Sequence, residues 1–400
     1  MVPLSDPIDP AGLEAFVGCV GLRPWRERVA LLQRMAARPT RCGRQALQRH
    51  CIELTIERLR RGLPNRPVSV AERWIATHAT AAAALFDTLT DAGRLRLVAM
   101  MRCALLEDQC LVPLFHLLRT AALQRSRGFE VAYAGLDDAA PFDLLLSRDG
   151  AEAEVACDVV SAEEGRGVHR GAWFDLVDRM DPELQTWLAS HPGRYILKMT
   201  LPQGLRAGGD ETLGVLHQRI TSMLAADKRG DHDAAAVLRL DPLLLAAAQA
   251  DELGLMPRLR REFGPEAHLA VTVAGGGVFV MAARAGQEND VAGAVRRRLA
   301  QLAPTRLTGA RPGILAMFIE DTDRAEWALL RDRLDLEGEA RQFMTHPEAR
   351  SVVAVTCASR LELFGLPEPD SAPGGELRFR NPAHPAAKAP ALAPAVLSSL

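Results

Sequence analysis

Four carboxylates lie close together in the middle of the sequence, at a spacing that predicts one acidic face of a sheet. Glu152, Glu154 and Asp158 alternate along EAEVACDVV, and Asp143 opens the preceding apolar stretch DLLLS. Because side chains alternate across a strand, the first three share a face, and a hairpin brings Asp143 within reach of it. Carboxylates this close repel one another, so they must be solvated, protonated or neutralised by a cation. Mg²⁺ is a suitable cation, because it binds one or two carboxylates plus waters. The plainer interpretation is the solvated face of a half-buried strand.

The segments around these carboxylates follow one another in a distinctive order. A helical stretch runs into GFEV, and PFDLLL, a turn, EVACDVVS and GRGVH come next. Over Leu111 to Leu201 this order resembles the core of the PD-(D/E)XK superfamily, the nucleases of restriction-endonuclease-like fold. In that pattern an aspartate heads the second strand and Glu-x-Lys lies on the third. The resemblance implies that Asp143 is the motif aspartate.

The third strand departs from this motif. The alignment rests on matches at Cys157, Ser161, Gly165, Arg166 and His169. It puts Ala156 at the glutamate position and Asp158 at the lysine position, and the preceding helix offers no glutamate over Phe115 to Leu118. The lysine of such sites activates the attacking water and stabilises charge on the phosphate. Glu154, on the same strand face, and Lys198, on a later predicted strand, are the residues that would replace the missing ligand and the missing lysine.

The resemblance leads to functions of different classes. The first is hydrolysis of a nucleic-acid phosphodiester with Mg²⁺ or Mn²⁺, in which Asp143 and Glu154 hold the metal and Asp158 and Lys198 complete the catalytic set. The second is a catalytically inactive member that binds DNA, RNA or a protein partner, and the replacements Ala156 and Asp158 favour it. An unrelated α/β scaffold is the third alternative, because a fold does not fix a function.

A glycine- and arginine-containing loop, GRGVHR, precedes the next predicted helix. Backbone N–H groups at the start of a helix attract anions, so we expect Arg166, His169 and Arg170 to bind phosphate. The alternative is an ordinary loop that leaves a strand. Further along, Arg296 to Arg298 could also touch phosphates, although a solvated helix face is the simpler expectation.

The pattern of apolar residues separates a helical part from a mixed part. Spacings of three and four residues predict helices over roughly the first 125 residues, and short strands alternate with helices from Phe129 onward. We therefore predict an α/β (α+β) fold, with a helical N-terminal region (1–105) before a restriction-endonuclease-like mixed sheet flanked by helices (106–205). Residues 206–366 would continue this core or form a second subdomain. The Pro/Ala-rich residues 367–400 predict a tail with little structure.

Composition limits the class of protein. The 400 residues are 48% apolar and 24% charged, as in a folded chain, and the net charge of −2 excludes a globally basic DNA-coating protein. Seven cysteines without a CxxC pair argue against a disulfide framework or a zinc ribbon. We find no signal peptide and no apolar run of about 18 residues, so we expect a cytoplasmic protein without a membrane partner. The N-terminal helices are the expected surface for a protein partner, and the oligomeric state is left open.

Overall fold

The computed structural model divides the chain into two compact units. It describes residues 8–62, 67–106, 109–206, 208–243, 252–264 and 266–399. The first unit comprises Met1–Ala37, Ala46–Ala162 and Ala292–Leu400, and the second comprises Arg38–Gln45 and Glu163–Val291. The second unit is thus inserted in the sequence of the first. This mixed α/β architecture, with N-terminal helices followed by two mixed sheets flanked by helices, confirms the predicted fold class.

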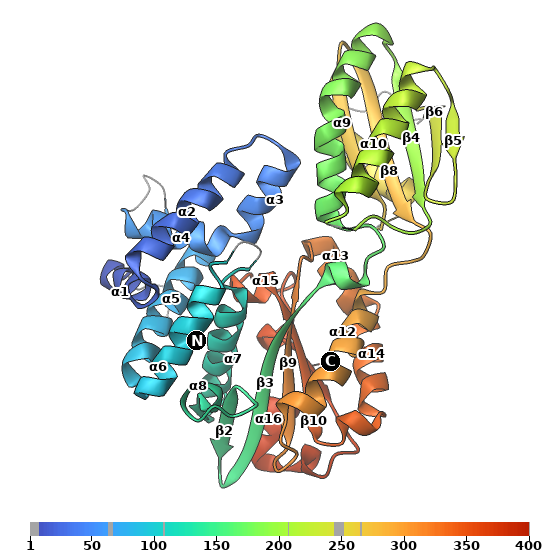
Figure 1. The fold of residues 1–400 in the computed structure, drawn as a ribbon. Coiled ribbons are helices and arrows are strands. Elements are labelled where there is room, and N and C mark those ends of the chain that lie inside the picture. The colour runs from blue at the N-terminus through green and yellow to red at the C-terminus, as the bar shows by residue number, and fades with distance from the viewer. Residues whose placement is uncertain are drawn as a thin grey trace. The chain divides into compact units, whose positions relative to one another are not determined.

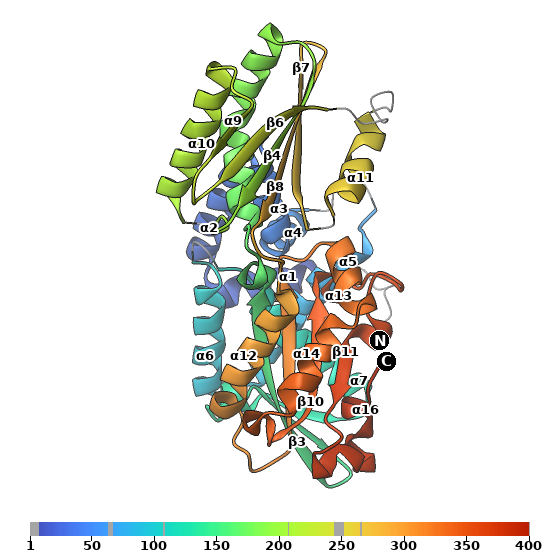
Figure 2. The same ribbon diagram turned by 90° about the vertical axis from the view of Figure 1, so that its right-hand side faces the viewer.

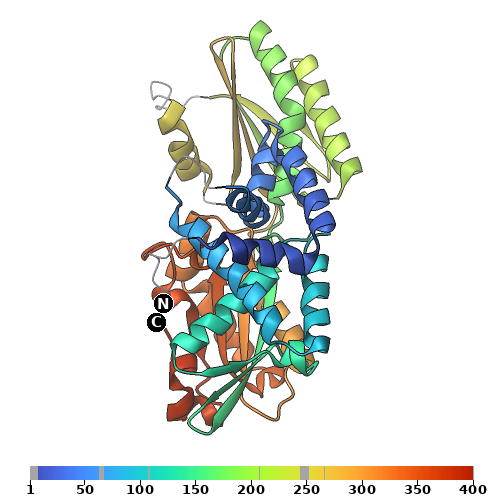
Figure 3. The same cartoon turned by 90° about the vertical axis from the view of Figure 1, so that its left-hand side faces the viewer.

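The N-terminal part is helical, as predicted (Figure 3). Its helices are α1 (Pro10–Val20), α2 (Leu22–Ala36), α3 (Arg41–Arg49), α4 (Cys51–Arg60), α5 (Val70–Thr88), α6 (Asp91–Cys103) and α7 (Val112–Ser126). Side chains start several of them: Ser69 and Glu72 form a capping box at α5, and Thr90 caps α6. Among the described residues, no helix is both long enough and apolar enough to cross a membrane.

The first unit contains a six-stranded sheet in the order β1-β2-β3-β9-β10-β11 (Figure 1). The strands are β1 (Glu130–Ala132), β2 (Leu144–Arg148), β3 (Ala151–Ser161), β9 (Gly313–Glu320), β10 (Val352–Ser359) and β11 (Leu377–Arg380). Strands β1, β2 and β3 pair antiparallel, β3, β9 and β10 pair parallel, and β11 is an antiparallel edge. The helix and three strands that carry the resemblance are therefore present as α7, β1, β2 and β3.

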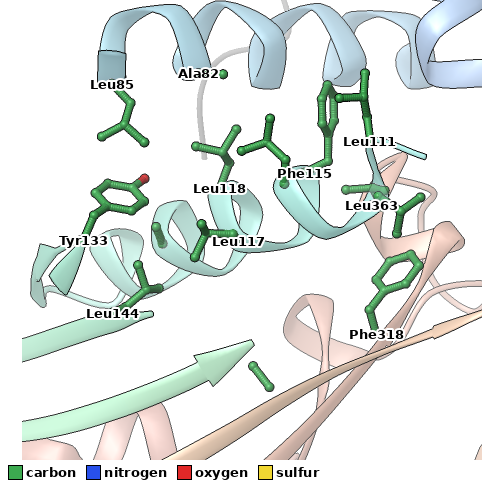
Figure 4. Packing of buried hydrophobic residues seen from close by; sticks show 14 of the residues in the cluster. Ala82, Leu85, Leu111, Phe115, Leu117, Leu118, Tyr133, Leu144, Phe318 and Leu363 are labelled. Carbon is green, nitrogen blue, oxygen red and sulfur yellow. The ribbon is translucent and has the colours of Figure 1, made fainter. Parts of the chain in front are cut away.

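Different helices cover the two faces of this sheet. On one face α7 lies between α5 and the strands, and Phe115, Leu117 and Leu118 pack among Leu144 and Phe318 (Figure 4). The opposite face carries α12 (Val291–Arg306), with α13 (Arg324–Asp332) and α14 (Asp335–Met344) beside it (Figure 2). Short helices α8 (Ala134–Asp137), α15 (Arg360–Leu363) and α16 (Ala393–Val396) complete the unit. Because helices lie on both faces, β3 is covered on both sides.

The second unit has its own five-stranded sheet, ordered β5-β6-β4-β8-β7. Its strands are β4 (Arg194–Leu201), β5 (Gly230–His232), β6 (Val237–Pro242), β7 (His268–Ala274) and β8 (Gly277–Ala285). Helices α9 (Arg170–Ser190) and α10 (Asp210–Ala225) pack on one face around Trp173 and Phe279. Helix α11 (Glu252–Phe263) packs on the other face through Leu259.

Two predictions about chain organisation are wrong. The predicted core over 106–205 runs across both units, because β3 pairs with β9 from the last third of the chain and not with β4. The stretch 367–400 is not an unstructured tail, since it forms β11 and buries Ala395 and Val396 completely. Its proline and alanine residues obscure the periodic pattern of apolar side chains that would predict a helix or a strand. The strand β11 pairs with the distant strand β10, and the local sequence does not show this partner.

Candidate functional site

The hairpin that carries the predicted site forms as expected. In its turn, Asp149 and Gly150 both have a positive φ (50° and 77°), which is the conformation of a two-residue type I′ hairpin. Leu144 lies opposite Val155, so Asp143, one residue before β2, lies beside Ala156. The register therefore places Asp143 beside Ala156, the residue that the predicted alignment puts at the glutamate position.

Asp143 is held by a backbone amide and a guanidinium. Its Oδ2 accepts a hydrogen bond from the N–H of Cys157 at 2.7 Å and pairs with Nη2 of Arg306 at 2.7 Å. Burial raises the pKa of Asp143, and Asp158 adds to the rise, while Arg306 and the Cys157 amide oppose it. Arg306 also donates to the carbonyl of Pro141 at 2.6 Å, which fixes the guanidinium against the start of β2.

Asp158, at the lysine position of the motif, meets a second guanidinium from the same helix. Arg298 donates to both of its carboxylate oxygens, with Nη2 to Oδ1 at 3.2 Å. Arg298 and Arg306 are separated by eight residues of α12, about two turns, and so project from one side of the helix. A cation is therefore present at the lysine position, but it comes from α12 and is paired with a carboxylate.

Glu154 is the most deeply buried of the four carboxylates. Its side chain is 0% exposed, and Oε2 accepts the N–H of Thr308 at 2.8 Å while Oε1 accepts the Thr308 hydroxyl. Arg311 lies 3.7 Å from Glu154 and pairs with Glu152 at 2.6 Å. The interpretation of this face as solvated is wrong for Glu154, because α12 and the loop after it cover the strand.

These contacts decide whether Asp143, Glu152, Glu154 and Asp158, which we call the carboxylate face, can bind a metal ion. A divalent cation needs carboxylate oxygens that are open to it, together with waters. Here every one of the four carboxylates already accepts from the chain's own cations or hydroxyl, and Ala156 offers only a methyl group at the ligand position. In the described part of the chain, no group of three or more His, Cys, Asp or Glu side chains is placed to hold a metal ion. The donor set does not fit the Mg²⁺ site that the resemblance implies.

Lys198, the predicted replacement for the motif lysine, lies in the second unit. It is on β4, where its Nζ pairs with Asp241 at 3.2 Å and lies 5.8 Å from the centre of the Phe263 ring. Asp143, Glu154 and Asp158 belong to the first unit, so the structure assigns Lys198 and the three carboxylates to different units.

The predicted phosphate-binding residues come together at the start of α9 in the second unit. His169 precedes this helix of 21 residues, and Arg166 and Arg170 lie on either side of it. The carboxylate of Glu163 accepts the backbone N–H of Arg170 at 2.8 Å and pairs with the Arg166 guanidinium. The helix start is thus occupied by the carboxylate of the chain's own Glu163, and phosphate binding by these residues stays a prediction.

Two further basic residues, Arg206 and His268, lie near this group. Burial and the nearby charges of Arg166 and Arg170 together lower the pKa of His268 to about 4, so its ring is neutral at pH 7. This ring lies 6.1 Å from the ring of Trp173 in the first turn of α9. Burial also lowers the pKa of His169, with Arg206 and Arg166 acting in the same direction against Glu163. The N–H of His169 donates to the carbonyl of Leu205 at 2.7 Å, which brings the neighbouring Arg206 to the start of α9. We call this set the basic cluster. It consists of Arg166, His169, Arg170, Arg206 and His268.

The residues that close the carboxylate face were missed by reasoning from the sequence. The run Arg296 to Arg298 was visible, but its expected role was a solvated face or a phosphate contact. In the structure Arg296 pairs with Glu339, and Arg298 pairs with Asp158 across 140 residues of sequence. Neither Arg306 nor Thr308 stands in a pattern that marks it as the partner of a distant carboxylate.

Comparisons with known proteins find no match for this chain. No family model, curated protein or solved structure matches it.

Proposed function

We propose that this chain is a non-catalytic protein of nuclease-like fold that binds the phosphates of a nucleic acid in the cytoplasm. The observation that carries the proposal is the pairing of Asp143 and Asp158 with Arg306 and Arg298 of α12. Two guanidiniums next to the carboxylates oppose the binding of a divalent cation by charge and by occupying the oxygen lone pairs. A metal-bound water would then have no site at the motif aspartate.

The basic cluster supports phosphate as the ligand. Three arginines, Arg166, Arg170 and Arg206, lie near the start of a long helix, where backbone N–H groups already favour an anion. The neutral rings of His169 and His268 can add hydrogen bonds but no charge. Phosphate contacts of this kind supply most of the affinity of non-specific nucleic-acid binding. The carboxylate of Glu163 occupies part of the cluster, so we expect the nucleic acid to compete with it.

A second candidate function is a metal-dependent nuclease. The register of β2 and β3 favours it, because Asp143 stands beside the third-strand motif positions as the superfamily pattern requires. In that case Mg²⁺ or Mn²⁺ would have to displace Arg306 from Asp143. Glu154 would have to leave Thr308 to become a second ligand.

The test is a cleavage and binding assay of the full chain. Single- and double-stranded DNA and RNA are incubated with Mg²⁺, Mn²⁺ or EDTA, and binding is titrated at several salt concentrations. We expect no cleavage, and binding that weakens with salt. Arg170→Ala should weaken binding several-fold and lower the salt slope by about one, whereas Arg179→Ala, on the same helix and paired with Asp175, should leave both unchanged.

Two outcomes would overturn the proposal. Metal-dependent cleavage that is lost in Asp143→Asn would establish the nuclease. A folded chain that binds none of the four nucleic acids would leave a protein partner, with the N-terminal helices as its expected surface.

A further inference from the structure

A pocket of about 440 Å³ lies in the first unit, at the amino ends of β9 and β10. Three prolines, Pro304, Pro312 and Pro347, form part of its wall, so the surrounding backbone is restricted in its motion. A pocket of this size suits a small organic molecule, because ligand sites commonly span about 300 to 1,000 Å³. Neither the carboxylates Asp143 and Asp158 nor the basic cluster line it.

The polar groups that line the pocket are mainly hydrogen-bond donors. Arg350 is exposed and has no carboxylate partner in the described ranges, and Arg311 and Ser351 also line the pocket. The Nδ1 atom of His384 accepts the N–H of Ala386 at 3.1 Å, so the proton of the neutral ring is on Nε2. Burial lowers the pKa of His384, which keeps the ring in this neutral, Nε2-donating form. Glu348 is the one lining carboxylate among the described residues.

We propose that this pocket binds a small organic oxyanion, a phosphate monoester or a carboxylate, through Arg350, Arg311, Ser351 and His384. Guanidinium, imidazole N–H and hydroxyl groups together match the oxygens of such a group. The proline walls would pack against its apolar part. This site is independent of the proposed nucleic-acid binding, which depends on the second unit.

Arg311 connects the pocket to the carboxylate face. Its Nε pairs with Glu152 at 2.6 Å and its Nη1 lies 3.7 Å from Glu154. An oxyanion in the pocket would compete with these two glutamates for the guanidinium. Glu154 would keep both of its hydrogen bonds from Thr308, so the loop after α12 would remain attached to β3.

The test is calorimetric titration of the full chain with three probes of similar size: phenyl phosphate, benzoate and benzyl alcohol. We expect at least one of the two anions to bind and the neutral alcohol to fail. The tighter anion then identifies the ligand as a phosphate or a carboxylate. Arg350→Ala should weaken anion binding about tenfold or more, since a charge-assisted hydrogen bond is lost. Arg350→Lys should retain part of the affinity.

Matched variants locate the binding and separate it from the proposed function. Arg333→Ala removes another exposed arginine of the first unit and should change nothing. Arg170→Ala removes a member of the basic cluster and should lower nucleic-acid binding while the anion still binds with Arg350-dependent affinity. Binding of all three probes with equal affinity, no binding to the folded chain, or equal affinity for wild type and Arg350→Ala would each overturn the proposal.

Discussion

Arg306, the last residue of α12, forms an ion pair of 2.7 Å with Asp143, at the start of β2, across 163 residues of sequence. The larger part of the second unit, Glu163–Val291, lies between these two residues in the chain. Helix α12, which follows this segment, thus supplies the cation that pairs with Asp143, which precedes the segment. The guanidinium of Arg306 is therefore the counter-charge of Asp143.

Removing the guanidinium should destabilise the first unit. In Arg306→Ala, Asp143 loses its cation while remaining only 18% exposed, and Pro141 loses a hydrogen bond. We expect the free energy of unfolding to fall by about 1 to 3 kcal/mol, less than for a fully buried pair. Asp143→Asn/Arg306→Ala should recover part of the loss, because an amide oxygen still accepts from Cys157 and no charge is left unpaired. Gln301→Ala, at an exposed position of α12, serves as the control.

The loss of stability in Arg306→Ala should be larger at neutral pH than at acidic pH. Burial already raises the pKa of Asp143, and removal of Arg306 should raise it further. A carboxyl whose folded-state pKa lies above its unfolded value favours folding at low pH, and this contribution is lost as the pH rises through the folded-state pKa. Urea unfolding should therefore show a larger difference between Arg306→Ala and wild type at pH 7 than at pH 3. A difference that grows on acidification would contradict the assignment.

Restoring the motif glutamate should not restore a metal site. Ala156 is 0% exposed beneath α12, so Ala156→Glu would insert a longer, charged side chain beside Asp143. We expect a loss of more than about 3 kcal/mol in stability, from overpacking and from burial of an unpaired charge. Ala156→Ser should cost much less. If Ala156→Glu folds with wild-type stability and gains Mg²⁺-dependent cleavage, then the ion pairs do not block the carboxylate face.

Elements stabilised by contacts near in sequence are predictable from local patterns, and contacts between distant segments are not. The helices of the N-terminal region and the hairpin of β2 and β3 were predictable, because three- and four-residue spacing, alternation and an Asp-Gly turn are local signals. The alternation also assigned Glu154 and Asp158 correctly to the face opposite Ala153 and Val155. What covers that face depends on α12, which follows an insertion of more than a hundred residues, and no local pattern encodes such a contact. The same reason explains why β11 was missed, since a short edge strand is defined by its partner β10.

Glu57, in α4, should stabilise the N-terminal helices in a pH-dependent way. Its carboxylate accepts from Nε1 of Trp25 at 2.8 Å and from Nε of Arg60 at 3.0 Å. Burial alone would raise the pKa of Glu57, but the bonds from Arg60, Trp25 and Arg61 outweigh it and lower the pKa below 4.5. This contribution is present above the unfolded-state pKa and is lost as the pH falls through the folded-state value.

The substitution Glu57→Gln tests this contribution. We expect the free energy of unfolding to fall by about 1 to 3 kcal/mol at pH 7, and the difference from wild type to shrink as the pH falls below 4.5. Glu27→Gln is the matched control, because its pair with Arg23 is largely exposed and its loss should change the free energy of unfolding little at any pH. A loss for Glu57→Gln that is independent of pH would assign it to packing and not to charge.

Glu163 should act as an internal competitor of phosphate in the basic cluster. It accepts the Arg170 N–H at the start of α9 and pairs with Arg166, so it uses donors that a phosphate would need. Glu163→Gln keeps the shape of the side chain and removes its charge. We expect it to strengthen nucleic-acid binding about three- to tenfold at low salt, because a phosphate no longer displaces a carboxylate. The adjacent Glu164→Gln removes the same charge at an exposed position and should have a smaller effect. Equal gains in the two variants would mean that net charge alone controls affinity, and a weaker Glu163→Gln complex would mean that Glu163 holds the cluster in its binding form.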